Sequence, residues 1–168
     1  MEPQLLDYIP PDVETCVIRY GYTKALANNE KILGYVSDGF WADAGTPGRY
    51  FRLNCDALER KLTLPHLDPL GGYALEPKRD VADVVRMGED VELGQDVQIV
   101  PPVLLGEGVR VGDHATVGPF AIVGARAQLG RESKVSRSVV ETGARVDAGE
   151  FISHSFVGRR DRLSFDAS

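Results

Sequence analysis

The sequence predicts a mainly β fold, a parallel β-helix built from stacked coils of short strands. Three observations support this prediction. An aliphatic residue recurs at every sixth position from Met87 to Val135, a glycine usually follows it, and a small residue or valine occupies the fifth place of each hexad. Nine consecutive hexads, residues 87–140, keep this register without a gap. A fixed short period of this kind is the signature of a repeat architecture.

Each hexad is interpreted as a short strand followed by a corner. The aliphatic side chain points into the stack, and the fifth residue fills the narrow space beside it. Glycine follows the aliphatic residue because the corner needs backbone conformations that a Cβ atom penalises. One coil cannot bury its apolar face alone, whereas a stack of coils can. An α-helix is excluded by a glycine at nearly every sixth place, and a sandwich would not keep a six-residue register.

The register shifts by one residue after Val139. The aliphatic positions resume at Val140, Val146 and Ile152, which brings the total to twelve hexads. The fifth place then falls on Ala144, Glu150 and Phe156. Because Glu150 breaks the apolar rule, we expect a looser turn or a bulge in the last coil. The polar tail from Arg159 to Phe165 is typical of a terminal cap, and either this tail, with Phe165 folded over the open end, or a partner would cover the stack.

The sequence of the first third of the chain predicts a small α/β segment. Short helices are expected at residues 3–9 and 24–29. Two strands, at residues 31–36 and 40–42, are predicted to pair through the Asp38-Gly39 turn of a hairpin. A longer helix should begin after Thr46 as N-cap, with Pro47 in its first position.

That longer helix is predicted to be amphipathic. Its apolar face comprises Phe51, Cys55, Leu58 and Leu62, at the spacing of one helical stripe. The prolines and glycines that follow, between residues 63 and 72, predict a linker into the repeat.

Composition narrows the function classes. The chain has 168 residues, 43% of them hydrophobic, and a formal net charge of −6. An acidic chain argues against nucleic acid or an anionic membrane surface as the main partner. No apolar run approaches the roughly 20 residues that span a bilayer. Cys16 and Cys55 form no metal-ligand spacing, and we expect two reduced, partly buried thiols in a cytoplasmic protein.

The segment from Gly34 to Pro47 contains the string Trp-x-Asp-x-Gly-Thr-Pro. It resembles the closing section of sugar-1-phosphate nucleotidyltransferases, in which this motif ends the catalytic domain and a hexapeptide β-helix often follows. The resemblance covers nearly the whole chain. It is closest to mannose-1-phosphate guanylyltransferases, where segments similar to Pro101-Pro102-Val103 and Gly118-Pro119-Phe120 recur in the β-helix.

The resemblance implies a left-handed β-helix of about four coils, with three hexads to a coil. It also implies a division of the chain. Residues 1–62 would be the remnant of a nucleotidyltransferase catalytic domain, 63–84 a linker, 85–158 the β-helix and 159–168 a tail.

The resemblance further implies a chemistry. In that family a sugar phosphate oxygen attacks the α-phosphorus of a nucleoside triphosphate and releases pyrophosphate, with Mg²⁺ neutralising phosphate charge. Asp43 would be one metal ligand, Gly45 and Thr46 would shape the loop beside the sugar phosphate, and Trp41 would pack beneath it. The simpler alternative is that Asp43 accepts hydrogen bonds from backbone amides before the helix, and that Trp41 lies in the core.

Other elements of the family's site do not occur in the sequence. We find no Gly-x-Gly-Thr-Arg-Leu loop for the nucleotide, no second metal carboxylate and no sugar-phosphate lysine. The chain is therefore expected to be inactive alone. It would act with a chain that carries the nucleotide-binding half, or assemble as a homo-oligomer through the β-helix.

Two other functions stay open. The chain could be a non-catalytic assembly or regulatory module. It could also be a β-helix acyltransferase that uses a histidine base, for which His66, His114 and His154 are the candidates. His114 falls in a variable corner position, where an exposed structural histidine is the plainer interpretation.

Overall fold

The computed structural model describes residues 2–59, 61–62 and 84–166 of the chain. It divides into two compact units, residues 1–39 and residues 40–168. No helix in the described part of the chain is long and apolar enough to cross a membrane. The predicted linker at residues 63–72, and nearly all of the 63–84 segment, lie outside the described residues.

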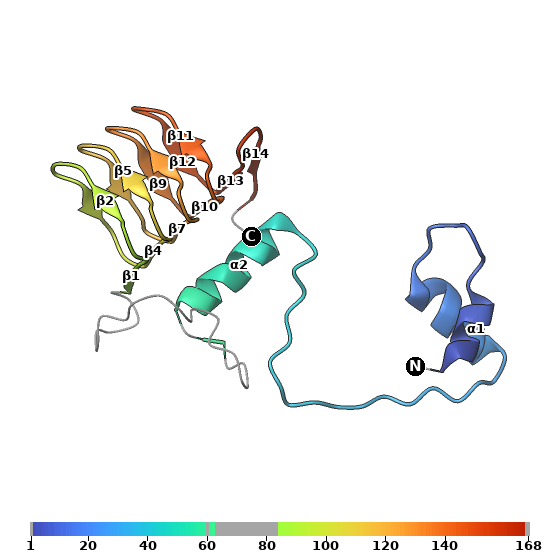
Figure 1. The fold of residues 1–168 in the computed structure, drawn as a ribbon. Coiled ribbons are helices and arrows are strands. Elements are labelled where there is room, and N and C mark those ends of the chain that lie inside the picture. The colour runs from blue at the N-terminus through green and yellow to red at the C-terminus, as the bar shows by residue number, and fades with distance from the viewer. Residues whose placement is uncertain (1, 60, 63–83, 167–168) are drawn as a thin grey trace. The chain divides into compact units, whose positions relative to one another are not determined.

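The second unit contains a parallel β-solenoid of about four turns, which confirms the predicted fold class (Figure 1). Sheet A comprises β1 (Val85–Met87), β4 (Val103–Leu105), β7 (Ala121–Val123), β10 (Ser138–Val140), β13 (Ser155–Val157) and β14 (Arg162–Ser164). Sheet B comprises β2 (Glu92–Leu93), β5 (Arg110–Val111), β8 (Gln128–Leu129) and β11 (Arg145–Val146). Sheet C comprises β3 (Gln98–Ile99), β6 (Thr116–Val117), β9 (Lys134–Ser136) and β12 (Phe151–Ser153).

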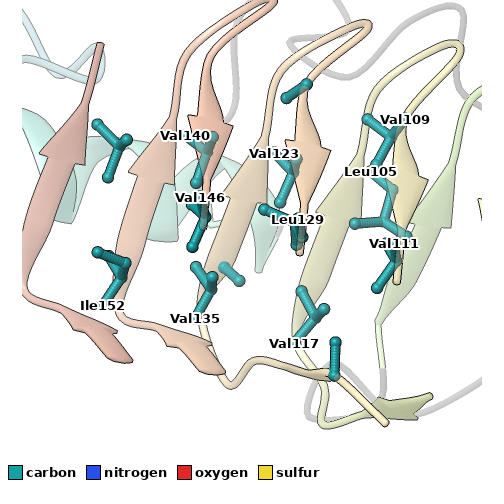
Figure 2. Packing of buried hydrophobic residues seen from close by; sticks show 14 of the residues in the cluster. Leu105, Val109, Val111, Val117, Val123, Leu129, Val135, Val140, Val146 and Ile152 are labelled. Atoms are coloured by element: carbon teal, nitrogen blue, oxygen red, sulfur yellow. The ribbon is translucent and has the colours of Figure 1, made fainter. Parts of the chain in front are cut away.

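The solenoid core is a column of aliphatic side chains, one from each hexad (Figure 2). The predicted inward aliphatic positions from Leu105 to Ile152 are all buried. In the first coil, at the end of the stack, Met87 and Ile99 are partly buried and Leu93 is 43% exposed. The fully buried side chains include Leu105, Val117, Val123, Val135 and Val140. Every coil thus buries its apolar face against the next, as the repeat predicted.

The shift in register after Val139 comes from a shortened corner. Val103 pairs with Ala121, 18 residues later, whereas Ala121 pairs with Ser138, 17 residues later. Serine hydroxyls then take the inward places: Ser138 Oγ donates to the Ser136 carbonyl at 2.7 Å, and Ser155 Oγ to the Ser153 carbonyl at 2.8 Å.

The expected inward places of Val139 and Phe156 are therefore wrong. Ser138 and Ser155 are buried there instead, while Val139 and Phe156 are half-buried between two inward neighbours on the same strand. Losing one corner residue moves each of these side chains to the other face, because successive strand residues alternate. The outward placement gives Phe156 a new role, since it now faces the helix outside the sheet.

The last coil has no bulge in its pairing. Residues 151–153 of β12 pair one to one with residues 134–136 of β9. Glu150 is accommodated by polar contacts: it binds the guanidinium of Arg162, and its carboxylate accepts from the Asp147 N–H at 2.9 Å. A charged residue is tolerated here because no further coil follows above it.

The tail adds a strand to the last coil and does not fold over its end. Strand β14 pairs antiparallel with β13 and extends sheet A. Phe165 does not cover the open interior. Its ring lies 5.0 Å from that of Phe51 and 5.2 Å from that of Phe156, on the outer side of sheet A.

Helix α2 (Pro47–Leu58) lies along the outer face of sheet A (Figure 1). Thr46 caps it as predicted, because its Oγ1 accepts from the Arg49 N–H at 3.3 Å. Leu58 is buried against Leu104 and Ile122 near one end. Tyr50 stacks on Phe156 near the other, with ring centroids 5.7 Å apart. Phe51, Cys55 and Leu58 of the predicted stripe are at least partly buried on the helix, whereas Leu62 lies beyond its end at Leu58. The contact of Tyr50 was not predicted.

The first unit contains η1 (Pro3–Tyr8), the π-helical turn η2 (Ile18–Tyr22) and α1 (Thr23–Ala27). The helices expected at residues 3–9 and 24–29 are present, but η2 was not predicted. The two strands predicted at residues 31–36 and 40–42 are wrong, since neither segment forms a strand. A strand needs a neighbour for its backbone hydrogen bonds, and residues 31–36 make none to other described residues.

Candidate functional site

The loop before α2 is organised around Asp43. Its Oδ1 accepts from the Gly45 N–H at 3.0 Å, and its Oδ2 accepts from Nη1 of Arg49 at 2.6 Å. A Cβ atom on Gly45 would lie 3.0 Å from Asp43 Oδ1, closer than most real Cβ contacts, so a glycine suits this turn. Asp43 therefore makes the local contacts that the simpler alternative predicted, and an ion pair that was not predicted.

This loop and α2 enclose a hollow of about 440 Å³. It is lined by Trp41, Ala42, Asp43, Arg49, Arg52, Leu53 and Asp56. Trp41 lines one side of the hollow and is 82% exposed, so it is not a core residue. The structure thus brings Trp41 and Asp43 together around one hollow, with Gly45 and Thr46 in the turn beside it.

Two guanidinium groups and two carboxylates share the hollow. Arg49 is already paired with Asp43, and the two side chains are 62% and 48% exposed. An exposed pair of this kind is worth about 0–1 kcal/mol, so an incoming anion could compete for Arg49. Arg52 offers a second planar donor group of the type that binds phosphate well.

A magnesium ion fits these residues poorly. Mg²⁺ requires several oxygen ligands in near-octahedral geometry, and both oxygens of Asp43 already accept hydrogen bonds. Across the described residues, no group of three or more His, Cys, Asp or Glu side chains could hold a metal ion. Asp43 alone therefore does not supply the ligand set that a magnesium ion requires.

Two of the three candidate histidines, His114 and His154, lie at separate corners of the solenoid. His114 lies at an exposed corner in the left-handed region (φ 58°), with Nδ1 3.7 Å from Asp96 Oδ2. His154 lies at a different corner, where Nδ1 is 2.9 Å from Ser153 Oγ and the ring meets the edge of Phe165. His66 lies outside the described residues. The prediction that His114 is an exposed corner residue is confirmed.

An open groove on the outer face of sheet B was missed by sequence reasoning. It has a volume of about 590 Å³. Side chains from neighbouring strands of sheet B pair along this groove. Arg110 Nε lies 3.0 Å from Glu92 Oε2, and Arg145 donates to Gln128 Oε1 at 2.8 Å. The sequence does carry a signal for this groove. Each of these four residues directly precedes an inward aliphatic residue of sheet B, so its own side chain must point outward.

The two thiols have opposite environments. Burial, with smaller contributions from Glu59 and Asp56, raises the pKa of Cys55 to about 12. Cys16 is exposed, contrary to the expectation that both thiols are partly buried, and backbone hydrogen bonds from Arg19 and Ile18 lower its pKa. Cys55 belongs to the packing side of α2 and faces a groove of about 480 Å³ that includes Phe51 and Arg137.

Comparison of the sequence with known protein families finds no family that matches, and comparison with curated proteins finds no match. The likeness to nucleotidyltransferases therefore stands on the residues of the Trp41–Pro47 segment and on the hexapeptide repeat.

Proposed function

We propose that the chain is the C-terminal portion of a sugar-1-phosphate nucleotidyltransferase, of the kind that makes GDP-mannose. The observation that carries this proposal is the hollow at the start of α2, which Trp41 and Asp43 line and beside which the Gly45-Thr46 turn lies. A left-handed turn of the solenoid is part of the same proposal and rests on the same resemblance.

The residues of the hollow suit a sugar phosphate. Arg49 and Arg52, three residues apart on helix α2, supply two guanidinium groups to the hollow. The Thr46-capped start of α2 adds the positive end of the helix dipole. Together these groups would hold a phosphate while its oxygen attacks the α-phosphorus of the nucleotide and pyrophosphate leaves.

The nucleotide and the metal would come with another polypeptide. Asp43 is paired with Arg49 in this chain. In this proposal, Mg²⁺ would therefore bind only once the nucleotide-binding half adds further oxygen ligands. The chain alone should therefore release no pyrophosphate from a sugar 1-phosphate and any nucleoside triphosphate.

A chimera tests the proposal. Residues 34–168 of this chain replace the corresponding part of a mannose-1-phosphate guanylyltransferase, and pyrophosphate release from GTP and mannose 1-phosphate is measured. We expect activity in the chimera and its loss in Asp43→Asn. Asp38→Asn, which removes a carboxylate from the same exposed stretch, should leave the activity unchanged. A folded chimera without activity would refute the proposal.

A non-catalytic assembly module is the second candidate. Helix α2 covers the outer face of sheet A, whereas the pairs that cross sheet B are exposed and Phe151 on sheet C is 68% exposed. Flat, uncovered sheet faces suit side-by-side association of solenoids. Light scattering tests this role: a concentration-dependent oligomer that Phe151→Ser weakens supports it, and a monomer at all concentrations contradicts it.

A further inference from the structure

The outer face of sheet B carries charges in a fixed order along the stack. Its outward central side chains are Glu92 in β2, Arg110 in β5, Gln128 in β8 and Arg145 in β11. These residues pair in register from one strand to the next, so their side chains form one column. Gln128 is half-buried, and the three charged side chains are exposed. The column therefore begins with a carboxylate and ends with a guanidinium group.

The corners on both sides of this column repeat the order. At one corner the Arg126 N–H donates to the Glu107 carbonyl at 2.7 Å, and at the other the Glu132 N–H donates to the Asp113 carbonyl at 2.8 Å. Glu107 and Asp113 thus belong to the coil of β5, and Arg126 and Arg131 to the coil of β8. All four of these side chains are exposed. We call the central column and these four corner residues the sheet B face.

Two sheet B faces complement each other when their stacks run antiparallel. A two-fold axis that lies between the faces and parallel to the strands reverses the order of the coils and makes the interface isologous. The β2 coil of one copy then lies on the β11 coil of the other, and the β5 coil lies on the β8 coil. Glu92 consequently meets Arg145 of the second copy, and Arg110 meets the amide of Gln128. By symmetry, each of these contacts forms twice.

The corner residues match in the same arrangement. Glu107 faces Arg126 of the second copy, and Asp113 faces Arg131, so both corners bring opposite charges together. Asp147 is a further carboxylate of the β11 coil, and it falls at the place where the β2 coil has a glycine. Asp147 therefore meets no like charge.

The free chain satisfies these charges only in part. Among the described residues, Glu107 and Arg126 make no ion pair, and the guanidinium of Arg145 contacts only a neutral amide of the same sheet. Glu92 is paired with Arg110, but their side chains are 67% and 64% exposed. An exposed pair is worth about 0–1 kcal/mol, so Glu92 can take a second partner at little cost.

A second copy matches this face better than other occupants do. A nucleic acid or an anionic membrane would bring negative charge against the carboxylates of the first two coils. Two copies with parallel stacks would place Glu92 on Glu92 and Arg145 on Arg145, and like charges that face each other oppose association.

We propose that two copies of this chain associate through their sheet B faces in an antiparallel, two-fold dimer. This inference goes beyond the proposed function, because it uses only the solenoid, and it names the face and the orientation for the assembly module considered above. The interface is polar, so the dimer should weaken as salt screens its charges.

Sedimentation equilibrium of the full chain tests the dimer. We expect dimers at about 0.05 M salt and a clear loss of them at about 0.5 M. Arg145→Glu and Glu92→Arg each oppose like charges at two symmetric places, so each should raise the dissociation constant by about tenfold or more. Lys134→Glu makes the same change of charge at an exposed position of sheet C and should leave the dissociation constant unchanged.

A mixture of the two sheet B variants tests the orientation. In a mixed dimer the introduced arginine faces the introduced glutamate, while the original Glu92 and Arg145 face each other. Both pairs are thereby restored, and the mixed dimer should form more tightly than either variant binds to itself. Restored binding also shows that both variants are folded.

Four results would overturn the inference. These are a monomer at every concentration at low salt, a dimer that Arg145→Glu does not weaken, an equal effect of Lys134→Glu, and a mixture that associates no better than the single variants. An oligomer that Phe151→Ser weakens and Arg145→Glu does not would place association on sheet C. That outcome supports the assembly role and contradicts the sheet B dimer.

Discussion

Leu58 holds helix α2 on the solenoid, and its replacement by alanine should free the helix without unfolding the coils. The side chain is 1% exposed and packs against Leu104, Val84 and Ile122. Truncating a fully buried leucine to alanine costs about 2–5 kcal/mol, which includes the cavity left behind. The helix makes its contacts with the outside of sheet A, so this cost falls on helix docking and not on the pairing of the coils.

Hydrogen exchange by mass spectrometry measures the effect. A loss of about 2–5 kcal/mol in docking raises the exchange of α2 amides by roughly 30-fold to 5000-fold, since 1.36 kcal/mol is a factor of ten. Exchange in β7 and β10, inside the stack, should not change. Arg52→Ala alters an exposed residue of the same helix and should shift exchange by less than about 0.5 kcal/mol.

Two results would contradict this role of Leu58. An equal rise in exchange for α2 and for β7 would mean that helix and solenoid open as one cooperative unit. No rise in α2 would mean that Leu58 does not anchor the helix. Because the Asp43 loop directly precedes α2, the first outcome would also tie the geometry of that loop to the stability of the whole solenoid.

Three further results are expected. Phe165→Ala should lower the thermal midpoint by removing about 1–3 kcal/mol of ring packing against the helix, which calorimetry would detect; an unchanged midpoint would deny the tail this role. Gly106→Ala places a Cβ 2.5 Å from the backbone nitrogen of the next coil and should cost roughly 1–3 kcal/mol, whereas Gly34→Ala meets nothing within 4 Å and should be neutral in the same denaturant titration. At pH 8, iodoacetamide should alkylate Cys16 at least about 1000-fold faster than Cys55, because the pKa of Cys55 is raised to about 12 and that of Cys16 is lowered; comparable rates by peptide mapping would contradict the burial of Cys55.

The sequence by itself determined the solenoid. A six-residue period leaves few solutions, because each hexad must bury one aliphatic side chain and turn a corner, and only stacked coils satisfy both requirements. The helix after Thr46 was equally readable, since its cap and its apolar stripe are local features. The motif at Trp41–Pro47 could be found, and the Gly45 turn next to Asp43 follows from neighbours two residues apart.

Only the tertiary structure decided where non-local partners lie. It showed that the shortened corner puts Ser138 inside and turns Phe156 toward the helix, which a six-residue count cannot reveal. It gave Asp43 an ion pair with Arg49. It also left residues 31–36 without a strand partner, although their side chains favour a strand. Propensity is a property of the segment itself, whereas a strand exists only when another strand is present to accept its hydrogen bonds.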